Sequence, residues 1–221
     1  MAAEIRQITW FTILTASAAT IVILPIGIGV AWVMARGTFP GRSALEALVS
    51  LPLVMPPVAT GLLLLRFFGR RSPIGTVIDA LGVDVVFTWK AVVLAMGIMA
   101  FPLLARTAKA GFEQVNRRYE QIAASLGASP ARVFFSVSLP LARRSIVAGI
   151  ILAFSRALGE FGATIVVAGD IPGRTRTIAV AIFGLTENGR DAEAVGLLII
   201  SIAIAYTAVW MSNRLIRTGG T

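Results

Sequence analysis

Polarity along the chain alternates between long uncharged runs and short charged segments, and five of the runs suit membrane-spanning helices. A spanning helix needs about 20 mainly apolar residues to cross a hydrocarbon core roughly 30 Å thick. The runs are apolar throughout rather than at every second residue, so we expect helices and not the strands of a membrane barrel. The predicted spans are residues 8–35, 46–67, 87–106, 143–169 and 194–214.

The third span is the shortest, because only residues 91–105 separate Lys90 from Arg106. We extend it back to residue 87, with Lys90 reaching to the interface. The first span is expected to stay uncleaved, since its run is far longer than the roughly 7 to 15 apolar residues of a secretory signal. The sequence therefore predicts an all-α integral membrane protein that forms a single domain, residues 1–221.

Composition agrees with a membrane protein, since 57% of the residues are hydrophobic and only 14% are charged. A net charge of +9 would suggest nucleic acid in a soluble protein, but basic residues of membrane proteins gather on the cytoplasmic side. If the N-terminus is outside and the C-terminus inside, 11 of the 20 basic residues fall in cytoplasmic segments and 8 in outer ones. We therefore expect that orientation and no nucleic-acid partner.

Several chemistries are excluded by the residues that the chain lacks. It contains no cysteine and no histidine, which removes disulfides, thiolate chemistry and the usual transition-metal sites. Neither of its two lysines, Lys90 and Lys109, follows a glycine as a phosphate-binding loop requires. We therefore expect no metal, no cofactor and no ATP hydrolysis in this chain.

The segment at residues 118–140 is partly polar although it lies between two very apolar runs, and it is longer than a simple connection needs. Good helix formers lead to Gly127, and a helix that ends in a left-handed residue favours glycine there. Ser129 then fits an N-cap, and Pro130 fits the first position of a second helix. Periodicity alone is equally compatible with an amphipathic stretch that lies passively on the membrane surface.

Glu120, Ala123 and Gly127, followed after nine residues by the segment 137–140 (VSLP), resemble the cytoplasmic signature of permeases from binding-protein-dependent ATP-binding cassette importers. Ile122 and Val137 depart mildly from that signature, which has alanine and isoleucine there. In that family the first short helix docks into a cleft on a separate ATPase subunit, so the resemblance implies this role for the loop. The implied ATPase-coupling residues are Glu120, Ala123, Ala124, Leu126, Gly127, Ala128 and Ser129.

Four longer segments, residues 50–65, 68–75, 125–143 and 153–177, look like the molybdate permease branch of the same family. The resemblance implies a homodimer, two ATPase subunits that carry ATP and magnesium, and a periplasmic molybdate-binding protein. It also implies import of molybdate across the bacterial inner membrane by alternating access. The alternative substrates are tungstate and, more distantly, sulfate-type oxyanions; the alternative classes are an ion-coupled secondary transporter and a membrane scaffold.

Prolines and charges inside the spans support further hypotheses. Pro52, Pro56 and Pro57 remove backbone donors in the second span, which fits either a simple kink or a pathway lining with Pro56 and Pro57 at a gate. Arg156 and Glu160 lie four residues apart in the fourth span. They form either a self-satisfied structural pair or a charge pair beside the anion path.

Small residues recur every four positions at Ser155, Gly159 and Ala163, which would let helices approach closely. Packing within one subunit and packing across a dimer axis are equally compatible with this stripe. The turn at residues 170–173 is followed by Arg174 and Arg176. Those two cations are expected on the outer face, either in solvent or against acidic groups of the binding protein.

Overall fold

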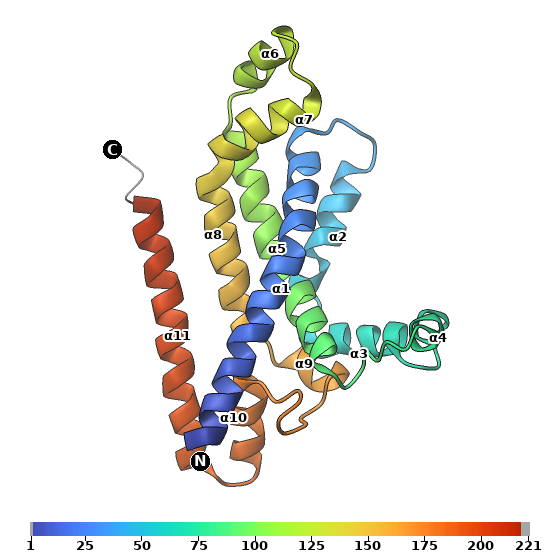
Figure 1. The fold of residues 1–221 in the computed structure, drawn as a ribbon, viewed down its shortest axis with the longest axis vertical. Coiled ribbons are helices and arrows are strands. Elements are labelled where there is room, and N and C mark those ends of the chain that lie inside the picture. The colour runs from blue at the N-terminus through green and yellow to red at the C-terminus, as the bar shows by residue number, and fades with distance from the viewer. Residues whose placement is uncertain (1, 218–221) are drawn as a thin grey trace.

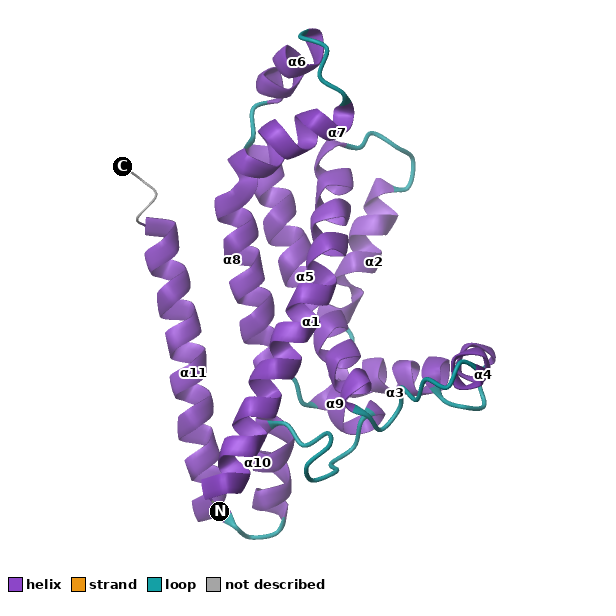
Figure 2. Ribbon diagram, in the orientation of Figure 1, coloured by secondary structure: helices purple, strands orange, loops and turns teal. Residues whose placement is uncertain are grey.

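The computed structural model describes residues 2–217 and contains helices but no strand within that range. Long helices stand side by side, and shorter ones lie at both ends of the bundle (Figure 1 and Figure 2). The elements are α1 Ala2–Arg36, α2 Arg42–Val54, α3 Pro57–Phe68, α4 Pro73–Ala80, α5 Trp89–Gln114, α6 Arg117–Ser125, α7 Pro130–Val133, the π-helical turn η1 Phe134–Ser138, α8 Leu139–Leu158, α9 Gly162–Val167, α10 Ile178–Glu187 and α11 Asp191–Arg217.

The long helices have the length and apolarity of membrane spans. These helices are α1, α5, α11 and the continuous helix Pro130–Leu158, which joins α7, η1 and α8. Helices α2 and α3 are bent by 110° at their break, and they make a fifth candidate span only when the pair is counted as one. In Figure 1, α10 and the start of α1 lie at one end of the bundle, and α6 and the end of α11 lie at the other. We refer to these as the α10 end and the α6 end.

The central helix α5 is lined with small residues that let its neighbours approach closely. Ala91, Ala95 and Ala100 have no exposed surface. On α1, a Cβ atom added at Gly27 would lie only 2.7 Å from Cδ2 of Leu104 on α5. Because lipid tails are as apolar as the helices, such close van der Waals packing, rather than exclusion of water, holds a bundle together in a membrane.

The predicted second span, residues 46–67, is not one continuous helix. It divides at Met55 and Pro56, which have extended backbone conformations, and α3 starts with Pro57 at its first position. A proline pushes the residue before it out of the helical region, so two adjacent prolines end one helix and begin the next. Single prolines elsewhere, such as Pro102, remain inside their helices.

Other predicted boundaries shift for local reasons. The predicted span 143–169 divides too, because α8 ends at Leu158 and α9 begins only at Gly162. The third span continues to Gln114, eight residues past its predicted end at residue 106. The first and fifth predicted spans fall inside α1 and α11, whereas α4 and α10 were not expected as separate helices.

The packing of α3 on α9 depends on Gly61. A Cβ atom at this position would lie 2.7 Å from the carbonyl oxygen of Ala163 and 2.9 Å from its Cα. We therefore expect Gly61→Ala to push the two helices apart and to lower stability by about 1–3 kcal/mol, a usual cost of overpacking. The measurement is the thermal unfolding midpoint of the purified chain in detergent.

Gly29→Ala is the matched control, because nothing lies within 4 Å of a Cβ atom added there. This change should leave the midpoint unchanged or raise it slightly, since alanine favours a helix over glycine. Equal midpoints for Gly61→Ala and the parental chain would show that α3 and α9 are not packed as described.

Candidate functional site

The α6 end carries the helix-turn-helix that the sequence predicts. Gly127 adopts φ +86°, and the N–H groups of Gly127 and Ala128 donate to the carbonyls of Ala124 and Ala123. Ser129 Oγ then accepts a hydrogen bond from the N–H of Arg132 and caps α7. The short helix α6 is thereby stopped and turned back toward the bundle, where α7 runs through η1 into α8.

Glu120 faces inward and joins three elements. The Nε atom of Arg36, at the end of α1, lies 3.0 Å from both carboxylate oxygens of Glu120. Ser138 Oγ in η1 donates to Glu120 Oε1 at 2.7 Å, and Arg36 Nη2 donates to the carbonyl of Val115 at 2.8 Å. We call Arg36, Glu120 and Ser138 the clamp. The sequence alone does not identify Arg36 and Ser138 as partners of Glu120, because they lie 84 and 18 positions away from it.

An aromatic contact fixes the π-helical turn beside the clamp. Phe134 packs edge-on against Trp32 of α1 with ring centroids 5.5 Å apart, and it lies 6.1 Å from Phe112 of α5. A π-helical turn inserted in an α-helix is rare and frequently lies at a functional site. Here it places Phe134 against α1 and α5 and Ser138 against Glu120 of α6, so the loop is attached to two long helices and continues into a third, α8.

The outer face of the same loop is apolar and open. Tyr119, Ile122, Leu126 and Phe135 are 49 to 83% exposed. Of the other predicted coupling residues, Ala124 and Ser129 are exposed, while Ala123 and Ala128 are half-buried. Exposed apolar patches mark surfaces that contact a protein partner or the membrane. The loop thus combines an inward attachment to the bundle with exposed apolar side chains.

Arg156 and Glu160 form the ion pair that their spacing predicts, at 2.7 Å between Nη1 and Oε2. Glu160 is almost fully buried, whereas the side chain of Arg156 is 27% exposed. Glu160 Oε1 also accepts the N–H of Ala163 at 2.8 Å and so spans the gap between α8 and α9. The carboxylate therefore has a structural task besides its pairing with arginine.

The second break in the bundle lies beside this pair. A Cβ atom added at Gly162, the first residue of α9, would lie 2.7 Å from Cβ of Pro57, the first residue of α3. Pro56 and Pro57 are exposed on this single chain. The two predicted pathway features, the prolines and the Arg156–Glu160 pair, are thus connected through the start of α9.

The predicted small-residue stripe does not form one helical face, because α8 ends at Leu158 before the stripe is complete. Ala163 packs inside the chain against Gly61 of α3. Gly159 is exposed, and the Ser155 hydroxyl is buried without a hydrogen-bond partner. A role for Ser155 or Gly159 between two copies of the chain stays a prediction.

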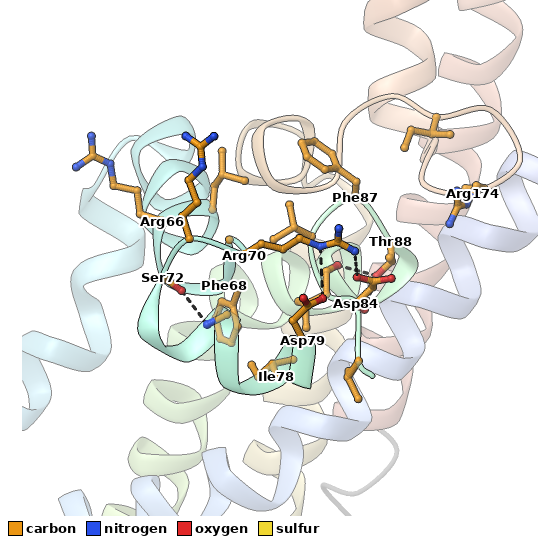
Figure 3. A pocket seen from close by; sticks show the side chains of 18 residues that line it. Arg66, Phe68, Arg70, Ser72, Ile78, Asp79, Asp84, Phe87, Thr88 and Arg174 are labelled. Atoms are coloured by element: carbon orange, nitrogen blue, oxygen red, sulfur yellow. Dashed lines mark hydrogen bonds and ion pairs between the residues drawn. The ribbon is translucent and has the colours of Figure 1, made fainter. Parts of the chain in front are cut away.

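At the α10 end, a hollow of about 760 Å³ lies beside α3, α4 and the turn that carries Arg174 (Figure 3). Arg70 points between Asp79 and Asp84, at 3.4 and 2.8 Å. The hydrogen bond from Arg70 holds the pKa of the Asp84 carboxyl below its usual range. The charge of Arg70 is therefore already balanced by these two carboxylates. Residues 2–217 contain no cluster of acidic residues arranged to hold a metal ion.

The two arginines after the 170–173 turn have different surroundings. Arg176 donates to both carboxylate oxygens of Asp170, at 2.6 and 3.0 Å, and lies 3.6 Å from Glu4. Arg174 is exposed at the rim of the hollow. Of the two, only Arg174 presents its charge outward.

Comparison with known proteins defines the class to which this bundle belongs. The family model described as "Binding-protein-dependent transport system inner membrane component" matches residues 23–217. The chain therefore belongs to this family, and it is a multi-pass protein of the inner membrane.

Particular relatives share most of their length with the chain. The molybdenum transport system permease protein ModB of Escherichia coli K12 is 44% identical over 96% of this chain and 93% of its own. The putative molybdenum transport system permease protein YvgM of Bacillus subtilis is 40% identical over 90% and 88%. A bacterial alginate ABC transporter has the same fold at 16% identity, with a TM-score of 0.74 over 96% of this chain and 78% of that one.

Removing Glu160 is expected to destabilise the junction of α8 and α9. Glu160→Ala leaves Arg156 without its carboxylate and the N–H of Ala163 without its acceptor. We expect a loss of about 3 kcal/mol, at the lower end for a broken buried pair because the arginine is partly exposed. The thermal unfolding midpoint in detergent measures it, and Glu193→Ala, which removes an exposed pair with Arg190, is the control.

Exchanging the two charges, with Arg156→Glu and Glu160→Arg together, also removes the acceptor for the N–H of Ala163. An arginine at position 160 offers no acceptor to the N–H of Ala163, so the exchanged protein loses stability whether or not the pair lines a path. Arg156→Lys and Arg156→Gln distinguish a structural pair from a pair beside the anion path more clearly, since both leave Glu160 in place. A midpoint for Glu160→Ala equal to that of Glu193→Ala would contradict the structural task assigned to Glu160.

Proposed function

We propose that the chain is the membrane subunit of an ATP-driven molybdate importer. The observation that carries the proposal is the 44% identity, over nearly the full length of both chains, to a molybdenum transport system permease. The clamped loop at the α6 end supports it, because an ATPase subunit needs an exposed apolar surface that is rigidly attached to the spans. The path itself needs no covalent chemistry from this chain.

In this proposal the α6 end is cytoplasmic, the N-terminus is outside and the C-terminus inside. Two copies of the chain form a homodimer with two ATPase subunits, which hold ATP and magnesium, and the face of Leu126 and Ile122 docks into the ATPase. A periplasmic molybdate-binding protein delivers the anion at the α10 end, where Arg174 is available to an acidic partner. Movement of α6 is transmitted through the clamp to α1 and α8, and the bundle alternates between outward and inward openings.

The candidate gate residues are Pro56, Pro57, Arg156 and Glu160. Helix breaks are tolerated at membrane depth only where protein or a wet cavity covers the freed backbone groups. The breaks before α3 and α9 meet each other, which makes this the natural place for an opening. Arg156 supplies the partly exposed cation there, while Glu160 moderates its charge, so that a dianion is attracted without being held.

A sulfate-type oxyanion is the second candidate substrate. A probable sulfate transport system permease of Chlorokybus atmophyticus is 36% identical over 87% of this chain. Tungstate is a further alternative, since it is a tetrahedral dianion like molybdate. The experiment is uptake of radiolabelled molybdate by liposomes that contain the chain with its ATPase and binding protein, with unlabelled tungstate or sulfate as competitor. Uptake without ATP, or no associated ATPase, would overturn the proposal.

Gly127 is expected to be essential for coupling rather than for folding. Its φ of +86° is unfavourable for a β-branched residue by about 1–3 kcal/mol, although the space around it is open. Gly127→Val should therefore distort the turn after α6 and reduce substrate-stimulated ATPase activity in liposomes. Membrane insertion and yield should stay near those of the parental chain.

Gly127→Asn is the matched control, because asparagine tolerates the left-handed conformation. It should retain most of the stimulation that the valine variant loses. If both variants are stimulated like the parental protein, the turn has no role in coupling.

A further inference from the structure

Four charged side chains join α2 to α5 at the α6 end. Lys109 Nζ lies 2.8 Å from Glu46 Oε1 and 3.6 Å from Glu113 Oε1. Arg42 lies 3.0 Å from Glu46 and 3.3 Å from Glu113. Cations and carboxylates alternate, so each group has an opposite charge on both sides. We call Arg42, Glu46, Lys109 and Glu113 the ring.

Apart from the ring, α2 makes few buried contacts with the rest of the bundle. Val49 is its only buried residue, in a small cluster with Met34 of α1 and Ala105 of α5. Leu48 and Val54 are 62 and 82% exposed. By contrast, α5 is the most buried of the long helices. The ring and this cluster therefore hold a thinly packed helix against a rigid one.

The ring lies between the clamp and the helix break. Glu113 is two residues before Val115, whose carbonyl accepts a hydrogen bond from Arg36 of the clamp, and α6 begins two residues after Val115. At its other end α2 finishes at the break before Pro57, which packs on α9. The ring thus lies on the route of contacts that connects α6, through α5 and α2, to the break before Pro57.

We infer that the ring is a latch. It holds α2 against α5 in this conformation, and it opens when α6 moves, so that α2 pivots about its break and the adjoining α9 is released. Its pairs are partly exposed, with side chains 19 to 45% accessible. Such pairs are individually weak, which suits a contact that must open in every cycle. The inference rests on the proposed function, because it takes ATPase-driven movement of α6 as the input.

The test removes both carboxylates with Glu46→Gln and Glu113→Gln together. Because the chain contains no cysteine, spin labels attach only at introduced ones, at Leu48→Cys on α2 and Val147→Cys on α8. Labelled chain is diluted with unlabelled chain and assembled with its ATPase in liposomes. Without nucleotide, the double variant should show a longer and broader distance between the labels than the parental ring. Its basal ATPase activity should rise severalfold while transport per ATP falls.

Two further variants decide whether pairing is responsible. An inverted ring, Arg42→Glu, Glu46→Arg, Lys109→Glu and Glu113→Lys, keeps the alternation and should restore the parental distance and basal activity. Arg190→Gln breaks an exposed pair at the opposite end and should change neither. A parental distance distribution in the double variant overturns the latch, as does a folded inverted ring that behaves like the double variant.

Failure of the proposed function is distinguishable from failure of the latch. If no ATPase associates with the parental chain, the importer proposal fails. The distance measurement on the chain alone in detergent still shows whether the ring holds α2 in place.

Discussion

Inside a bilayer no water is present to satisfy an open backbone donor or acceptor, so each interruption of a helix must be covered by another part of the protein. This chain has two interruptions at comparable places, before α3 and before α9. They cover each other: Pro57 packs on Gly162, Gly61 packs on Ala163, and Glu160 accepts the N–H of Ala163. The close packing of α5 with α1 and α8 serves as the frame that keeps these two irregular regions together.

The sequence predicts much of this frame because apolar length is a direct property of the chain. The spans at α1, α5, α8 and α11 follow from uncharged runs, and the loop after α5 follows from Gly127, Ser129 and Pro130. The 110° bend between α2 and α3 does not follow from the sequence. A proline shows where a backbone N–H donor is missing, but it does not show in which direction the next helix runs. The direction is set by packing on α9, which lies about a hundred positions further along the chain.

Several contacts at the site could not be predicted because the residues that make them lie far apart in the sequence. Glu120 belongs to a recognisable motif, yet its partner Arg36 belongs to none, and neither do the members of the ring. Arg156 and Glu160 could be paired from their spacing, whereas the bond from Ala163 to Glu160 required knowing that the helix ends at Leu158. Contacts within one helix can be predicted from the spacing of the residues. Contacts between helices cannot, because they depend on the whole fold and not on the two residues alone.

The uninterrupted helix from Pro130 to Leu158 is a shaft of 29 residues, about 44 Å long at 1.5 Å per residue. A continuous helix can transmit rotation about its axis as well as displacement along it. Each residue of an α-helix turns the chain by about 100°, so tightening the π-helical turn at Phe134–Ser138 into α-helical geometry would rotate the outer segment relative to the rest. The loop at one end and Arg156 near the other lie on the same continuous helix, so such a rotation would change the direction of the Arg156 guanidinium relative to the loop.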